Sequence, residues 1–250
     1  MNKKYLSLLI CITLMITFWT VDVYAQEKPL VSRPFGLILA LAALSLAPFV
    51  VIMMTSFVKI AVVLSIIRSA LGTQQIPPTQ VITGLAFILT IFIMTPVGLD
   101  VHRSIKDVIK KPVTDIVSDA SFKLLVDVWN KGNEPIRNFL IKHSHQKDRL
   151  LFYTLSKRMR AKEDRANLTH KDFSVIIPAF VISELKEAFQ IGFILFVPFI
   201  IIDMVIANIL LSMGMMMLSP TVISLPFKLL LFVLVDGWYL ITRGLILGYV

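Results

Sequence analysis

The chain has 250 residues, of which 56% are hydrophobic and 16% are charged, and its net charge is +9. Soluble domains carry roughly 25% charged residues, so a chain this apolar cannot fold as an ordinary soluble globule. A bilayer or a protein assembly must cover its surface. The basic excess comes without stacking aromatics or a nucleic-acid-binding module, so we expect no nucleic-acid partner.

Residues 1–25 have the pattern of a cleavable secretory signal peptide. Two lysines precede an apolar run, and the run ends in Val-Tyr-Ala, with small residues three before and one before a cut ahead of Gln26. We therefore expect cleavage between Ala25 and Gln26, which would place Gln26 on the outer face of an inner membrane. An uncleaved signal anchor is the alternative.

Residues 26–99 are expected to form a first pair of apolar helices. The run from 35 to 67 exceeds the roughly 20 residues that span a bilayer. Pro48 inside it is expected to kink or divide the helix, because proline lacks a backbone donor and clashes with the preceding turn. A glycine and paired prolines then mark a loop before the second apolar segment, 79–99.

Residues 100–175 form a charged section with 16 Lys and Arg, 10 Asp and Glu, and all four histidines. Apolar residues recur between the charges, which predicts short amphipathic helices. The basic cluster 157–162 is either a solvated helix face or a contact for lipid headgroups or an acidic partner. Cleavage of the signal puts this section on the periplasmic side. The positive-inside rule disfavours that side, although it weakens for loops longer than about 60 residues.

Residues 176–250 are expected to form a second apolar pair. The stretch 176–211 is interrupted by charges, and the stretch 221–250 follows a methionine-rich loop at 213–217. Methionine is unbranched and fills irregular gaps, so one copy of the loop would serve as core filler. Several copies around an axis would instead make a soft ring. The methionines concerned are Met213, Met215, Met216 and Met217.

Charges inside the apolar segments need partners, because a charge at the centre of a bilayer costs about 2.5 kcal/mol or more. We expect them to pair with neighbouring helices or with other copies of the chain. Lys228 is hypothesised to pair with Asp203 or Asp236. A proton relay through those two acids, in an ion- or proton-coupled transporter, is the alternative. The charges concerned are Lys59, Glu184, Lys186, Glu187, Asp203, Lys228 and Asp236.

No set of nucleophile, base and orienting group is visible, so we expect neither an enzyme nor a cofactor. His143 and His145 lie close together, but two loop histidines without further ligands predict solvated side chains and no metal site. Cys11 is the single cysteine, which excludes an intramolecular disulfide framework and a cysteine metal site.

Several ordered blocks resemble the FliP/SctR family of type III secretion systems, which serve flagella and virulence injectisomes. They are spread over roughly residues 35–245, and only the signal peptide and the charged middle section are poorly covered. The blocks are Met54–Leu64, Arg68–Pro78, Ser183–Phe193, Pro198–Asp203, Gly214–Pro220, Leu225–Leu229 and Val235–Trp238.

The resemblance implies a core pore-forming subunit of the export gate, conducting unfolded secreted proteins across the bacterial inner membrane within a basal body. The fold implied is all-α, polytopic and membrane-associated, with long kinked helical hairpins that assemble into a helical channel complex. The implied assembly is a homopentamer with FliQ/SctS-like and FliR/SctT-like small partners, beside FlhB/SctU-like and FlhA/SctV-like proteins. The methionine-rich loop is implied to act as a gasket, and many helices to pack above the membrane plane.

The two kinds of secretion system leave different traces in the sequence. Residues 57–59 and 207–210 resemble injectisome members, whereas the cleavable signal and residues 225–228 resemble flagellar ones. We favour the injectisome, and genes for a needle or for a hook beside this one would distinguish the two.

Overall fold

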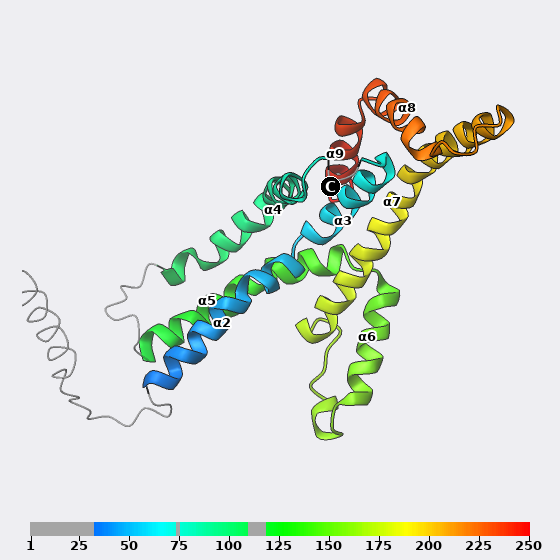
Figure 1. Cartoon of the computed structure of the whole chain (residues 1–250). Helices are drawn as coiled ribbons and strands as arrows, with labels where there is room; N and C mark the ends of the chain where they lie inside the picture. The colour runs from blue at the N-terminus through cyan, green and yellow to red at the C-terminus, as the bar shows by residue number, and fades with distance from the viewer. Residues whose placement is uncertain (1–32, 74–75, 110–118) are drawn as a thin grey trace, which may run out of the picture. The chain divides into compact units, whose positions relative to one another are not determined.

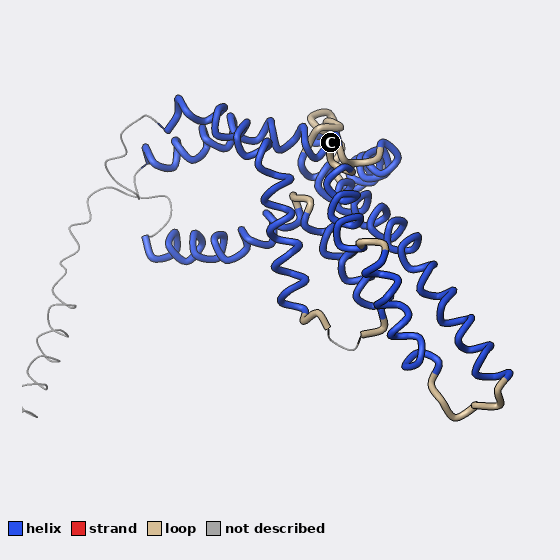
Figure 2. The backbone as a smooth tube through the Cα atoms, turned by 90° about the horizontal axis from the view of Figure 1, so that it is seen from above, coloured by secondary structure: helices blue, strands red, loops and turns tan. Residues whose placement is uncertain are grey.

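The computed structural model describes residues 33–73, 76–109 and 119–250, and these residues form helices joined by loops and contain no strand (Figures 1 and 2). The predicted signal peptide, with its Ala25–Gln26 cleavage site, lies outside them. The helices are α2 (Arg33–Met53), α3 (Phe57–Leu71), α4 (Thr79–Ile109), α5 (Asp119–Lys142), α6 (Gln146–Met159), the 3₁₀ turn η1 (Glu163–Arg165), α7 (Phe173–Ser212), α8 (Pro220–Leu234) and α9 (Gly237–Leu247).

Among the described residues, 33–47 belong to one unit and those from 48 onward belong to a second. The described part of the first unit, 33–47, is helical. The second unit contains the packed core and all the site residues discussed below.

The first long apolar run is broken at a different place from the one expected. Helix α2 contains Pro48 and continues to Met53, and the break lies at residues 54–56. Thr55 Oγ1 donates a hydrogen bond to the Ile52 carbonyl oxygen (3.0 Å) at this turn. Such a bond offers the backbone an alternative to helix geometry, which explains a break without proline or glycine.

The core forms where α3 packs against α7. The buried residues of α3 recur at helical spacing and include Ile60, Val63, Leu64 and Ile67, each no more than 1% exposed. Gly192 of α7 lies against Ile66 so closely that an added Cβ would stand 2.4 Å from Ile66 Cδ1. Glycine is therefore required for the two helices to approach to this distance.

Helix α7 is a single helix of 40 residues, although it contains two prolines and four charged residues, three of which lie within one turn. The charged positions that interrupt the apolar pattern lie within this helix and do not end it. Helix α6 packs on its N-terminal half and α3 on its middle, while α8 returns along its C-terminal part (Figure 1). Helix α7 thus connects the charged section to the methionine loop.

The charged section begins inside a helix. Helix α4 runs from the apolar segment through Asp100 to Ile109 and packs against α5. Two amphipathic helices follow: α5, which is 24 residues long, and α6, which is 14. They are longer than the short helices expected.

The last apolar stretch is two helices with a bend of 59° between them. Asp236 stands at the bend in a left-handed backbone conformation, with φ 51° and ψ 53°. A Cβ on the following residue, Gly237, would lie 2.4 Å from the Phe232 ring, so that glycine allows the helices to fold back closely.

By length and composition, two helical segments could cross a membrane: Thr79–Val108 and Phe173–Ser212. The bent pair α8 and α9 would add a third if it counts as one span. Large apolar side chains stay exposed along all of them, for example Phe92 (62%), Phe193 (68%) and Val233 (74%). The described helices therefore form a membrane helical protein whose outer faces need a lipid or protein cover.

Candidate functional site

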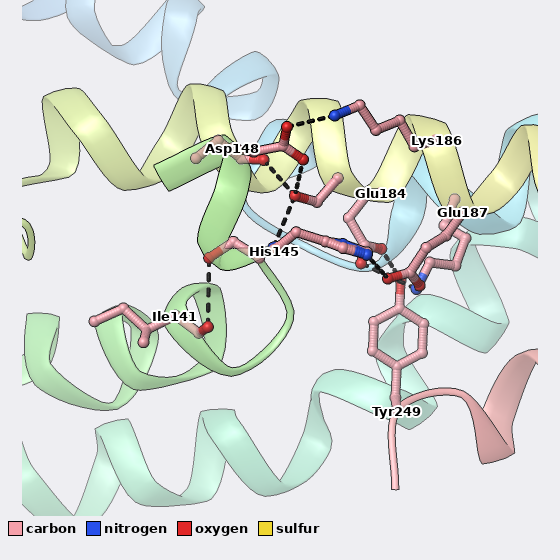
Figure 3. A network of polar contacts seen from close by, with 11 residues as sticks. Ile141, His145, Asp148, Glu184, Lys186, Glu187 and Tyr249 are labelled. Atoms are coloured by element: carbon pink, nitrogen blue, oxygen red, sulfur yellow. Dashed lines mark hydrogen bonds and ion pairs between the residues drawn. The ribbon is translucent and has the colours of Figure 1, made fainter. Parts of the chain in front are cut away.

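A cluster of charged side chains lies inside the core, between α3 and α7 (Figure 3). Lys59 Nζ lies 3.0 Å from Glu184 Oε1 and 2.6 Å from Glu187 Oε2. The Lys59 and Glu184 side chains are 3% and 0% exposed. Tyr249 donates a hydrogen bond from its hydroxyl to Glu184 Oε2, and its ring lies 4.3 Å from the lysine nitrogen. This core cluster satisfies each buried charge with an opposite charge or a donor.

A second set of contacts joins α6 to the same turn of α7. Ser183 donates to Asp148 Oδ2 (2.9 Å) and accepts a bond from the His145 backbone N–H (2.9 Å). Lys186 forms an ion pair with the other oxygen of Asp148. His145 Nε2 lies 3.2 Å from Glu187 Oε1 and links the two sets. Because Glu184 and Lys186 point to different faces of α7, one turn of that helix contacts both α3 and α6.

The pKa of the Asp148 carboxyl reflects two opposing effects. Burial acts to raise it, but hydrogen bonds from Lys186 and Ser183 outweigh burial, so the pKa lies below its ordinary value. The carboxylate therefore stays ionised and holds α6 against α7.

His143, at the end of α5, is packed between aromatic rings. Its ring centroid lies 4.7 Å from that of Phe139 and 4.9 Å from that of Tyr249. Burial, with the positive charges of Lys142 and Lys59, lowers the pKa of His143 to about 4. The imidazole is therefore neutral at physiological pH and acts as a packing group.

Lys228 of α8 forms an ion pair with Asp203 of α7. The Lys228 Nζ lies 2.6 Å from Asp203 Oδ2, and Ser224 donates a hydrogen bond to the other carboxylate oxygen. The lysine side chain is 4% exposed. This pair joins the two helices that flank the methionine loop, whereas Asp236 lies at the α8–α9 bend, away from Lys228.

The methionine loop, residues 213–217, connects α7 to α8. Gly214 adopts a left-handed conformation (φ 71°), and the Met215 N–H donates to the Leu210 carbonyl oxygen (2.9 Å), which closes the end of α7. Met213 and Met215 are 61% and 42% exposed, and Met216 and Met217 are 81% and 101% exposed. In a single copy of the chain these side chains fill no core.

Comparison with known proteins agrees with the resemblance seen in the sequence. The sequence pattern of the FliP family matches residues 40–245 of this chain. The chain belongs to the FliP family. Within the described residues, no group of three or more His, Cys, Asp and Glu side chains is arranged to hold a metal ion.

Relatives of this FliP-family chain come from both flagellar and translocation systems. The flagellar biosynthetic protein FliP of Bacillus subtilis is 45% identical over 231 residues, which cover 92% of this chain and 98% of that protein. The Yop proteins translocation protein R of Yersinia pestis is 45% identical over 214 residues, covering 86% and 95%. The hypersensitivity response secretion protein HrcR of Ralstonia nicotianae is 37% identical, covering 86% and 96%.

Four residues of the site in this chain were not found by sequence reasoning. Ser224 precedes Lys228 by one helical turn, so the two side chains share a helix face. That spacing could have identified Ser224 as a neighbour of the Lys228 ion pair. Ser183 likewise stands one turn before Glu187. No local pattern marks Asp148 or Tyr249, because their partners are distant in the chain and only packing brings them together.

Proposed function

We propose that this chain is a pore-forming subunit of a type III secretion export gate, which conducts unfolded proteins across the bacterial inner membrane. The observation that carries the proposal is the exposed methionine loop at the junction of α7 and α8. Flexible, apolar side chains presented in several copies around an axis would form a deformable seal. Membership of the FliP family supports the same role.

The buried charges support a structural role. Lys59 and Lys228 each lie against acids of α7 in nearly solvent-free surroundings. An acid already held by a lysine and a serine, as Asp203 is, forms a fixed joint between helices. We therefore propose that these pairs hold the helices in place and take part in no catalytic step.

The proposed assembly is a homopentamer with FliQ/SctS-like and FliR/SctT-like partners, beside FlhB/SctU-like and FlhA/SctV-like proteins. The exposed apolar faces of α4, α7 and α8 need such a cover. The charged section, 100–175, is proposed to lie on the periplasmic side, with cleavage of the signal peptide before Gln26. The injectisome is the proposed system, and residues 57–59 and 207–210 support that choice.

Deletion of the gene, with secretion measured in the culture medium, tests the proposal. The deletion strain is expected to keep secreted substrates inside the cell, and a plasmid copy of the chain is expected to restore their export. Needle and translocator proteins would be the lost substrates for an injectisome, and hook proteins and flagellin for a flagellum. Normal export by the deletion strain in both substrate classes would overturn the proposal.

A further inference from the structure

An open cavity of about 590 Å³ lies between α4 and α5, beside the core cluster. Its apolar lining includes Ile93 and Val97 of α4, Phe139 of α5, and Tyr249. We call this space the α4–α5 cavity. The charged and polar side chains around its apolar part indicate which kind of ligand it would bind.

Two acids and two bases line the α4–α5 cavity, so its charges balance. On α4, Asp100 and Arg103 pair with each other at 3.1 Å. On α5, Lys142 Nζ donates a hydrogen bond to the Val250 backbone oxygen (3.4 Å), and its ammonium keeps further N–H donors. The Glu134 carboxylate has no hydrogen bond or ion pair among the described residues. A ligand with one negative and one positive group matches this set better than a simple anion or cation does.

The cavity opens beside a part of α4 that is suited to lipid. Helix α4 contains one of the two segments long and apolar enough to cross a membrane. On this helix Ile88 and Phe92 are 64% and 62% exposed, and Pro96, one turn further, lines the cavity. An acyl chain that lies along this apolar stripe would therefore end at the cavity wall, where the charged residues of α4 begin.

The charges of α5 follow the order of groups in a phospholipid. Helices α4 and α5 pack together and run in opposite directions (Figure 1), and Gly132 lies against Val101 and Ile105 in the charged end of α4. Lys142 therefore lies nearer the apolar part of α4, and Glu134 lies about 12 Å further along α5, toward the charged end. In a phospholipid the phosphate follows the acyl chains, and the amine of the headgroup lies beyond the phosphate.

We propose that the α4–α5 cavity binds a phospholipid whose headgroup has a phosphate and a primary ammonium, as phosphatidylethanolamine has. Lys142 contacts the phosphate, Glu134 accepts hydrogen bonds from the ammonium, and the acyl chains lie against Ile88 and Phe92. Phosphatidylglycerol has the phosphate but no ammonium, so it would leave Glu134 without a partner. This lipid site does not depend on the proposed pore.

Native mass spectrometry of the full chain, purified in detergent and stripped of lipid, tests the proposal. Phosphatidylethanolamine and phosphatidylglycerol with the same acyl chains are added together in equal amounts. Phosphatidylethanolamine is expected to bind in about tenfold excess, because a hydrogen bond to a charged group typically changes an equilibrium by about that factor or more. Excess glycerophosphoethanolamine, which has the headgroup without acyl chains, is expected not to displace the lipid.

Two variants assign the two ends of the headgroup. Glu134→Gln is expected to remove the preference, so that the two lipids bind in about equal amounts, whereas Lys142→Gln is expected to weaken the binding of both by about tenfold. Lys131→Gln, at an exposed position of α5 outside the cavity, and Asp164→Asn, in the exposed turn η1, are the matched controls and should bind as the wild type does. The ratio of two lipids in one sample does not depend on how much of the protein is folded.

The outcomes decide between this ligand and others. Equal binding of the two lipids by the wild type would overturn the inference, and so would a Glu134→Gln variant that keeps the excess of phosphatidylethanolamine. An excess of phosphatidylglycerol would overturn it in favour of an anionic lipid. Displacement by glycerophosphoethanolamine would overturn the role of the acyl chains and show a site for the soluble headgroup.

Discussion

Lys59 of α3 and Glu184 of α7 form an ion pair of 3.0 Å in the core, with side chains 3% and 0% exposed. Burying two charges costs several kcal/mol each, and good geometry with further hydrogen bonds is needed to offset that cost. Glu187 and Tyr249 supply the further contacts. The ion pair therefore fixes how α3 lies on α7. Its stability depends on the contacts that Glu187 and Tyr249 add.

Removal of the lysine is expected to destabilise the chain strongly. Lys59→Met leaves Glu184 buried without its cation, which is expected to cost about 3–5 kcal/mol in the free energy of unfolding. Adding Glu184→Gln removes the uncompensated charge and is expected to recover part of the loss. Thermal unfolding of the detergent-purified protein measures both. If Lys59→Met alone were as stable as the wild type, this role for the ion pair would be contradicted.

A methyl group at Gly192 is expected to push α3 away from α7. Gly192→Ala places a Cβ within 2.4 Å of Ile66 Cδ1, and such overpacking costs about 1–3 kcal/mol. Adding Ile66→Val removes that atom and is expected to recover part of the stability. Gly84→Ala is the matched control, because nothing lies within 4 Å of its added Cβ; the control should unfold at or above the wild-type temperature.

The Asp203–Lys228 pair is expected to serve structure and not proton transport. Asp203→Asn alone leaves a lysine that is 4% exposed without its anion, and assembly and secretion should fall together. The double variant Asp203→Asn with Lys228→Gln removes both charges and is expected to recover both. Secretion and the amount of assembled complex are measured in the same strains. Full assembly without secretion in the double variant would support a proton relay instead.

Acid is expected to destabilise the chain through His143. The pKa of its imidazole is lowered to about 4, chiefly by burial, so between pH 6.5 and 4 the unfolded chain binds more protons than the folded one. Stability therefore falls as the pH falls through this window. Unfolding temperatures at pH 7.5 and 5 measure the effect, and His143→Gln should reduce the difference between them.

The acid response of Asp148 is a separate effect with the same sign. Its pKa is lowered in the folded chain, so its contribution is lost as the pH falls through and below the ordinary range of an aspartate. If the unfolding temperature of His143→Gln differed between pH 7.5 and 5 as much as that of the wild type, groups other than His143 would dominate the acid response in this range.

Much of the helical layout could be predicted, because long apolar runs and amphipathic periodicity directly indicate helices. The break at residues 54–56 could not, since it contains no proline or glycine and rests on the local bond from Thr55 Oγ1 to the backbone. Pro48 was the stronger signal in the sequence, yet α2 accommodates it.

The site shows a similar division. From the sequence, both Asp203 and Asp236 were possible partners of Lys228. Asp236 lies eight residues after Lys228, and eight residues of a helix span about 12 Å, which disfavours a pair between them. A hairpin centred on the methionine loop places 203 opposite 228. By contrast, the contacts of Tyr249 with Glu184 and of Asp148 with Ser183 join distant parts of the chain, and only tertiary packing determines them.

We propose that the methionine loop seals the assembled gate, and leakage of small solutes through that gate tests this proposal. Met215, Met216 and Met217 are changed together to serine, and the entry of a small charged dye is measured in cells with equal amounts of assembled complex. Dye entry is expected to increase markedly over wild type in the triple variant, and not to increase in Met204→Ser or Met94→Ser, which lie outside the loop. Dye entry equal to wild type in fully assembled triple-variant complexes would contradict it.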